Sequence, residues 1–434
     1  MKITVFQVVI LIVFILSAVV AVTFFALGGG RGGGGQEEVG RVEIWGTYDQ
    51  GAFQRISQVF NENTDDFDGV SYVEKNEATF TDELVEALAS GRGPDLFFLE
   101  HPLILRHRDK IIPIPFDIVS RRAFRDMYVE ASELFVDPEG VIALPTSADP
   151  LVLYWNRSIF SNEGVSSPPR FWDEVLVLAT DRLNVRDDTG NVSQSAIALG
   201  EYQNIDNAKE ILSMLIMQAG GGVVASNEAG ELFSQLNIRF QNGISPAESA
   251  LRLYTDFANP IKPVYSWNRG FRSAKEEFLS GSLAMYIGFA SELRDIRLRN
   301  PNLNFDVAPV PQSRDGGTVT FGNVVGLAIP KNSENINGAA RIAISLSSTF
   351  GNEVFTDILG LTPARRDLLV APPSEDLFKK VFFDAALIAR AWLDPNIGRT
   401  NSMFKDMIEL TTSGRLRVGE AVGGADSTME SLLR

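Results

Sequence analysis

The sequence predicts an α/β protein whose strands form a largely parallel sheet, and three observations support this fold class. Short apolar strands alternate with amphipathic helices from residue 42 onward, which is the pattern of βαβ units. The chain has 434 residues, 45% of them apolar and 22% charged, so it is globular and long enough to build two packed cores. An apolar run over residues 141–156, interrupted by polar residues at 146–150, predicts two short strands where the chain crosses between two sheets.

The N-terminal residues 5–27 contain no charge, and this length predicts one transmembrane helix within an anchor over residues 1–27. One lysine precedes the span and acids follow it, so we expect the N-terminus inside the cell and an exported body. A glycine-rich linker over residues 28–39 predicts a flexible tether. A cleaved signal peptide is the alternative, with Ala26 and Gly28 around the processing site.

The first elements of the body alternate between strand and helix. They are expected at residues 42–45, 51–61, 70–74, 79–90 and 96–99. Because a parallel α/β sheet binds ligands beyond the carboxyl ends of its strands, the residues after the first and third strands are candidate site residues. These residues are Thr47, Tyr48, Asp49, Glu100 and His101. As alternatives, Asp49 caps the following helix, and Glu100 and His101 belong to a solvated loop.

Later elements follow the same reasoning. Helices are expected at residues 208–218, 245–257 and 335–346, and strands at residues 304–310 and 324–329. The helix at residue 245 has the clearest start, because Ser245 and Glu248 form a capping box with Pro246 in the first turn. Asn204 precedes the helix at residue 208, and its amide could bond a ligand hydroxyl or cap that helix.

Composition and charge exclude several classes of function. The chain carries 39 basic and 55 acidic residues, a net charge of −16, so we expect no nucleic-acid partner. With no cysteine and two histidines, it has no thiolate for a metal site or a nucleophile, and little material for an imidazole-bound metal or a Ser-His-Asp triad. Acid-rich turns at residues 65–68 and 187–191 lack EF-hand spacing. We therefore expect no cofactor, no bound metal and no enzymatic activity.

Five motifs follow one another along the body. They are Gly91-x-Gly-Pro-Asp95 before a buried strand, Leu144-Pro145 leading into Tyr154-Trp155-Asn156, Phe171-Trp172-Asp173-Glu174, Phe278-x-x-Gly281-x-x-Ala284-Met285-x-x-Gly288, and Phe305 through Pro311. In this order they resemble the extracellular solute-binding proteins of ABC importers, in the carbohydrate-binding group that includes maltose-binding proteins.

This resemblance implies an α/β clamshell of the periplasmic-binding-protein type, with a ligand between two lobes. One lobe would comprise residues 40–147 and 318–365, and the other residues 150–311 and 366–434. The resemblance further implies that the protein captures a sugar or oligosaccharide and delivers it to the permease subunits of an ABC importer. We expect a monomer, held at the membrane by a single-pass helix, with its body extracellular or periplasmic.

The resemblance also assigns ligand contacts to Asp149, Phe289, Phe321, Gly322 and Trp392. A sugar site combines flat apolar faces for the ring with carboxylates or amides for the hydroxyls. As structural alternatives, Asp149 kinks a hinge and Trp392 packs between C-terminal helices. Leu99 stands where an aromatic platform is common in the resembling proteins, which weakens any transfer of maltodextrin specificity.

The sequence leaves two other functions open. One is an extracellular carbohydrate-active enzyme that uses paired carboxylates such as Asp149 and Glu100, although no acid pair on adjacent strand ends is evident. The other is a receptor for a non-sugar solute such as a peptide or a polyamine, which the acidic surface would tolerate.

Overall fold

The computed structural model describes residues 39–64, 67–188, 190–227, 230–371 and 376–434. The predicted transmembrane helix and nearly all of the glycine-rich linker lie outside these residues. Within the described part, no helix has both the length and the apolar sequence needed to cross a membrane. The described residues belong to one structural unit, Val39–Arg434.

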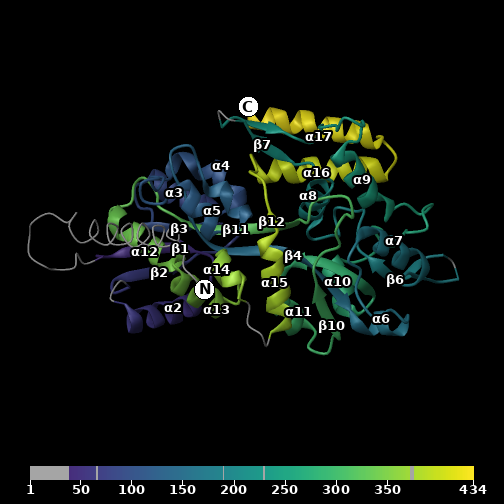
Figure 1. Ribbon diagram of the computed structural model, residues 1–434, viewed down its shortest axis with the longest axis horizontal. Coiled ribbons are helices and arrows are strands. Elements are labelled where there is room, and N and C mark those ends of the chain that lie inside the picture. Colours follow the sequence, from purple (N-terminus) through teal and green to yellow (C-terminus); the bar gives the residue numbers. More distant parts are fainter. Residues whose placement is uncertain (1–38, 65–66, 189, 228–229, 372–375) are drawn as a thin grey trace, which may run out of the picture. The chain divides into compact units, whose positions relative to one another are not determined.

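Ten strands of the described residues form one mixed sheet, in the order β2-β1-β3-β11-β4-β9-β6-β5, with β10 also paired to β4 and β12 to β11 (Figure 1). These strands are β1 (Val42–Gly46), β2 (Val70–Glu74), β3 (Leu96–Glu100), β4 (Leu144–Asn156), β5 (Val185–Arg186), β6 (Val192–Ile197), β9 (Leu283–Phe289), β10 (Phe305–Ala308), β11 (Thr320–Ala328) and β12 (Ala389–Arg390). A separate two-stranded sheet pairs β7 (Val224–Ser226) with β8 (Leu232–Ser234).

The prediction of a largely parallel sheet is correct for β1, β2 and β3 and for β6 with β9, but wrong for the centre and for the edge strand β5, which is antiparallel to β6. Strand β1 runs parallel to β2 and β3, and β6 runs parallel to β9. In the centre, β11 is antiparallel to β3 and β4, and β4 is antiparallel to β9. The reason is that β4 carries the chain from one half of the sheet to the other and β11 carries it back, so the two strands run in opposite directions.

The prediction of two short strands separated by a kink is wrong for β4. This strand is continuous from Leu144 to Asn156, but its main partner changes along its length. Residues up to Pro150 pair with β11, whereas Leu151 onward pairs with β9. The polar residues do not interrupt the strand because they bond within the sheet, as the Thr146 Oγ1 donates to the carbonyl of Val325 at 3.1 Å.

Helices cover the sheet and follow most of the predicted positions. They are α2 (Gln50–Asn63), α3 (Phe80–Ala89), α4 (Ile104–His107), α5 (Arg121–Met127), α6 (Arg157–Asn162), α7 (Trp172–Asp181), α8 (Ala208–Gln218), α9 (Pro246–Asp256), α10 (Ala274–Ser280), α11 (Leu293–Arg299), α12 (Ile336–Ser347), α13 (Thr349–Leu359), α14 (Arg366–Leu369), α15 (Leu377–Leu387), α16 (Ile397–Thr412) and α17 (Val418–Leu433). Short 3₁₀ helices are η1 (His101–Leu103), η2 (Arg108–Lys110), η3 (Glu130–Phe135) and η4 (Ala290–Glu292).

Local sequence explains the best-defined helix starts. The Asp49 carboxylate caps α2 by accepting from the amide of Ala52 at 2.7 Å, so the capping alternative for Asp49 is realised. Ser245 caps α9 in the same way, with Pro246 at the first helical position as the sequence predicts. Every residue of α8 except Glu210 is buried, because this apolar helix lies inside the body rather than on its surface.

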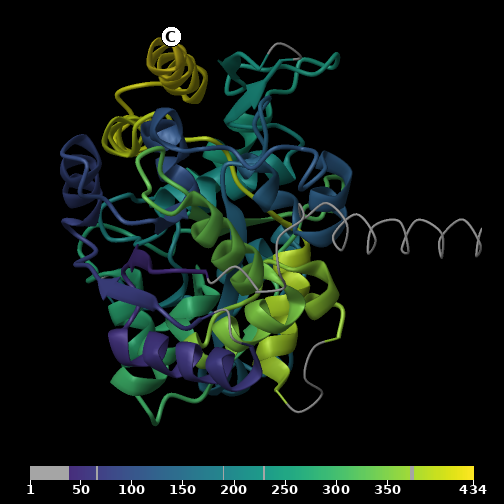
Figure 2. The same cartoon turned by 90° about the vertical axis from the view of Figure 1, so that its left-hand side faces the viewer.

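The C-terminal helices α16 and α17 pack against each other at the side of the body away from α2, as Figures 1 and 2 both show. Helix α17 also reaches the β7–β8 hairpin, where the Glu430 carboxylate accepts from the amide of Ser234 at 2.8 Å. The core extends over both halves of the sheet. It includes Trp45 and Trp155, which the sequence places in apolar strands.

Candidate functional site

A row of polar side chains lies on one face of the central strands. Directly opposed residues of antiparallel strands share a face. Val325 of β11 stands opposite both Glu100 of β3 and Ser147 of β4, and Asn323 stands opposite Asp149. Residues two apart on a strand also share a face. We call Glu100, Ser147, Asp149 and Asn323 the central polar row, and it lies where the two halves of the sheet meet.

Tyr48 joins this row from the loop after β1. Its half-buried ring contacts Phe98 and Phe355 edge-on, with centroids 4.9 and 5.4 Å away. Burial raises the pKa of the Tyr48 phenol above its ordinary value, and the carboxylates of Glu100 and Asp149 raise it further. The structure therefore brings together predicted site residues from the loop after β1 and from strands β3 and β4. Thr47 is half-buried beside Tyr48, whereas Asp49 is exposed at the cap of α2.

Asp149 holds the start of η4. One carboxylate oxygen accepts from the amide of Ser291 at 2.9 Å, and the other accepts from the Ser291 hydroxyl at 2.6 Å. Burial raises the pKa of Asp149 to about 6, and the hydrogen bonds from Ser291 oppose this rise. The carboxylate therefore ties β4 to η4, which directly follows β9.

Glu100 differs from Asp149 in that its side chain is exposed. Even so, the surrounding protein raises the pKa of this carboxyl by desolvation, and the charge of Glu77 adds to the effect. Neither Glu100 nor Asp149 forms an ion pair with any residue that the structure describes. The Glu100 carboxylate is therefore available to hydrogen-bond donors of a ligand, whereas each Asp149 oxygen already accepts one hydrogen bond from Ser291 and has room for one more donor.

Three aromatic rings lie beside the row and contact one another. Phe289 and Phe321 are 9% and 4% exposed, with ring centroids 6.4 Å apart. His101 lies 5.9 Å from the Phe321 ring, and its Nδ1 accepts from the amide of Val324 at 3.3 Å. Burial lowers the pKa of His101 to about 3, so the ring is neutral. Phe289 and Phe321 thus pack as a buried cluster and present little area for stacking a sugar.

Gly322 has a packing role in this structure. A Cβ atom at this position would lie 2.7 Å from the Cβ of Ala389, which is closer than real contacts allow. Glycine therefore permits β12 to pair with β11.

The structure places Trp392 and Asn204 in packing and hydrogen-bonding roles. The Trp392 indole is 4% exposed, stacks on Phe404 with centroids 6.1 Å apart, and donates to the Ser213 hydroxyl at 3.2 Å. The Asn204 amide nitrogen donates to two loop carbonyls, and its oxygen accepts from the indole of Trp267 at 3.0 Å. Trp392 therefore packs between α8 and α16, only one of which is a C-terminal helix.

A polar cluster at the start of α8 is not among the site residues that the sequence predicts. Lys209 is 8% exposed, and its Nζ donates to the Asp394 carboxylate at 2.6 Å and to Thr400 and Asn401 at 3.0 Å. Its charge also contributes to the lowered pKa of His101, so the cluster lies near the end of β3. In the sequence, the signal for this cluster is a lysine within a strongly apolar helix, because a charge that becomes buried there requires polar partners.

A cavity of about 350 Å³ opens beside this cluster. Tyr202, Asp206, Lys209, Glu210 and Lys405 belong to its lining. Burial raises the pKa of Tyr202 to about 12 and also raises the pKa of Glu210. Among the described residues, no group of three or more His, Asp or Glu side chains is placed to hold a metal ion. The side chains of the central polar row and those that line this cavity both offer hydrogen bonds to a polar organic ligand.

The structure thus combines a mixed sheet, two strands that cross between its halves, and polar groups where they cross. Residues 46–343 match the family model of the bacterial extracellular solute-binding proteins. The chain belongs to this family.

Curated relatives include binding proteins of Brucella abortus strain 2308 and Brucella suis biovar 1 strain 1330, each 21% identical over 294 residues. The match covers 66% of this chain and 66% of each relative.

Solved structures with the same fold include sugar-binding proteins. A cyclic α-maltosyl-1,6-maltose-binding protein of Arthrobacter globiformis has a TM-score of 0.75 and 17% identity, covering 91% of this chain and 98% of that chain. A cyclo/maltodextrin-binding protein in complex with maltotetraose has a TM-score of 0.73 and 16% identity, covering 93% and 99%. A solute-binding protein of an ABC transporter from Thermotoga lettingae, bound to α-D-tagatose, has a TM-score of 0.67 and 19% identity, covering 91% and 100%.

Proposed function

We propose that this protein captures a sugar or an oligosaccharide and delivers it to an ABC importer. The central polar row carries the proposal, because carboxylate, amide and hydroxyl groups gather at the strands that join the two halves of the sheet. Such groups bond the hydroxyls in the plane of a sugar ring. The structural likeness to receptors of maltotetraose and tagatose supports a sugar over other solutes.

We further propose that the ligand lies between two lobes, residues 40–147 with 318–365 and residues 150–311 with 366–434. The change of partner between Pro150 and Leu151 in β4 supports a boundary at this point. Ligand contacts from both lobes would then shift the population toward the closed state.

Among the predicted site residues, Tyr48, Glu100 and Asp149 have the best geometry for ligand contact. Tyr202 and Glu210, which line the cavity at α8, are further candidates. Phe289, Phe321 and Gly322 would shape the site by packing beneath it, since they are buried.

We also propose that residues 1–27 anchor the protein and that residues 28–39 tether its body outside the membrane. The uncharged segment at residues 5–27 supports this arrangement. Intact-mass measurement of membrane-extracted protein should find the first residues retained. A chain starting near Gly29 would show cleavage instead.

Thermal-shift screening across monosaccharides, oligosaccharides, polyamines and short peptides tests the ligand class. A sugar should raise the melting temperature in a saturable way, because it binds the folded state. Small-angle scattering with that sugar should then show a smaller radius of gyration, and an unchanged profile at saturation would reject closure of two lobes. If only a polyamine raises the melting temperature, the ligand is a polyamine and not a sugar. Release of reducing sugar from an oligosaccharide would indicate an enzyme.

A further inference from the structure

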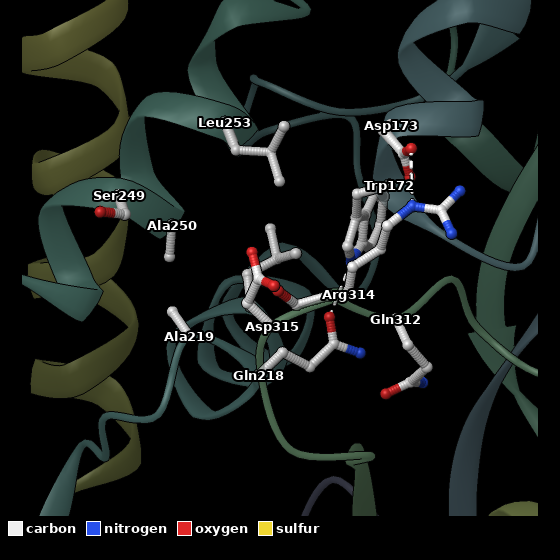
Figure 3. A pocket seen from close by; sticks show the side chains of 12 residues that line it. Trp172, Asp173, Gln218, Ala219, Ser249, Ala250, Leu253, Gln312, Arg314 and Asp315 are labelled. Atoms are coloured by element: carbon white, nitrogen blue, oxygen red, sulfur yellow. Dashed lines mark hydrogen bonds and ion pairs between the residues drawn. The ribbon is translucent and has the colours of Figure 1, made fainter.

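A second cavity, of about 360 Å³, lies beside the segment that joins β10 to β11 (Figure 3). Its lining comes from the first turn of α7, the C-terminal half of α8, helix α9 and residues 312–315. None of the lining residues belongs to the central polar row or to the cavity at the start of α8. The volume lies in the range of small-molecule sites.

The wall of this cavity is held in place by Gln218, which is 1% exposed. Its side-chain oxygen accepts from the Trp172 indole at 2.7 Å, and its nitrogen donates to the carbonyls of Pro311 and Val319 at 3.1 and 2.9 Å. Gly316 runs directly against the end of α8, since a Cβ there would lie 1.9 Å from the Gln218 carbonyl oxygen. This wall of the cavity is therefore fixed by hydrogen bonds and by close backbone packing.

The inner part of the lining is apolar. Trp172, Leu215 and Ala250 are 6%, 3% and 3% exposed, and Leu253 lies beside them. Figure 3 shows Leu253 and Ala250 on one side of the space and Trp172 and Gln218 on the other. Because the polar atoms of the Gln218 side chain are already bonded, this part of the cavity suits a compact apolar group.

The charges at the rim differ in their partners. The Arg314 guanidinium bonds the Asp173 carboxylate at 2.8 Å and the Glu174 carboxylate at 3.1 Å, and it stacks over the Phe171 ring. Its charge is therefore balanced within the protein. Asp315, by contrast, forms no hydrogen bond or ion pair with any residue that the structure describes. In Figure 3 its side chain lies among those that surround the cavity.

We propose that this cavity is a second ligand site, which takes a small organic amine with a compact apolar body. The ammonium group pairs with the Asp315 carboxylate, and the apolar body contacts Trp172, Leu215 and Leu253. An anion is disfavoured because Arg314 already has two carboxylate partners. This site goes beyond the proposed sugar site and does not depend on it.

Titration calorimetry on the full chain in detergent tests the proposal with 2-phenylethylamine and its neutral analogue 2-phenylethanol. The amine should bind saturably, and the alcohol about tenfold more weakly, since the charge pair is lost. Asp315→Asn should weaken amine binding about tenfold as well. The matched control is Asp117→Asn, which also removes one exposed carboxylate, but in the segment between β3 and β4, and should leave amine binding unchanged.

Ala250→Leu fills the cavity and should abolish binding of both probes. If this variant melts below the unaltered protein, the comparison of Asp315→Asn with Asp117→Asn still tests the proposal. Both positions are exposed, so neither substitution is expected to disturb folding. Absence of saturable binding, equal affinity for amine and alcohol, or equal effects of the two asparagine variants would overturn the proposal. Sugar affinity should be the same in Asp315→Asn and in the unaltered protein, which separates this site from the sugar site.

Discussion

The central polar row and the cluster around Lys209 both contain charged side chains, but the cluster buries and pairs them, whereas Glu100 of the row is exposed. In the cluster, the Lys209 ammonium has the Asp394 carboxylate and two further oxygen acceptors within 3.0 Å. In the row, Glu100 and Asp149 have no cationic partner among the described residues. Removal of one partner from the cluster would leave a buried charge uncompensated, whereas the carboxylates of the row have no cation to lose.

If this distinction holds, Lys209→Met should have the largest effect on the fold. The substitution leaves the Asp394 carboxylate, which is 4% exposed, without its cation. Loss of one partner of a buried ion pair costs about 3–5 kcal/mol of unfolding free energy. Urea denaturation measures this loss. Lys405→Met provides the control, because Lys405 lines the same cavity but has no ion pair within the described part of the chain; equal losses in both variants would contradict the pairing role.

An effect of similar size is expected for Trp392→Ala, because the indole packs between α8 and α16. Truncation of a buried aromatic side chain costs about 3–5 kcal/mol. The melting temperature without ligand should fall, while the affinity for a sugar found by screening should change little. Trp392→Phe retains a ring to stack on Phe404 and should recover most of the stability. A weakened affinity with an unchanged melting temperature would instead restore Trp392 as a stacking platform.

Asp149→Asn should act on ligand affinity and on pH dependence more than on the fold. If the carboxylate accepts a ligand hydroxyl, its loss should cost about 1.5–3 kcal/mol of binding free energy, measured by calorimetry. Ser291→Ala is the matched control, since it removes one donor to Asp149 but keeps the carboxylate. If the affinity of Asp149→Asn is unaltered, Asp149 does not contact the ligand and only holds Ser291 in place.

The pH dependence of stability tests the same residue without a ligand. The folded state raises the pKa of Asp149 from 3.8 to about 6, so the folded state holds the proton more tightly than the unfolded state. The resulting stabilisation is complete below pH 3.8 and is lost as the pH rises through about 6. The unaltered protein should therefore lose more stability over this pH window than Asp149→Asn. Denaturation curves at matched pH values measure the difference, and identical slopes would contradict it.

Much of the fold could be predicted because local patterns determine it. The helix over residues 208–218 was predicted with the bounds that α8 has, since a long apolar stretch ends there at glycines. The antiparallel centre could not be predicted, because the direction of β11 depends on pairing with β3, which is distant in sequence. The alternation of strands with helices predicts parallel pairing. It does not show the direction of β11, which returns from the other half of the sheet.

The site was only partly predictable for a related reason. Tyr48 and Glu100 follow from the rule that ligands bind beyond strand ends, and register then brings Glu100 to the same row as Asp149. Trp392 and Phe289 are assigned to the site by the family resemblance, which does not report how deeply other residues bury each ring in this chain. Lys209 was overlooked because its partners lie at residues 394–401, far along the chain.

The smallest expected effect belongs to Glu100→Gln, and it sharpens the contrast between the two regions most. Glu100 is exposed, so the substitution should leave the melting temperature unchanged. Glutamine keeps one acceptor oxygen, so a lost ligand bond should cost about 0.5–1.5 kcal/mol of binding free energy. Glu77→Gln removes a charge that acts on Glu100 through space, without altering the row itself. A weaker affinity in Glu100→Gln but not in Glu77→Gln would show that the Glu100 side chain contacts the ligand, whereas equal losses would mean that the row acts only through its negative potential.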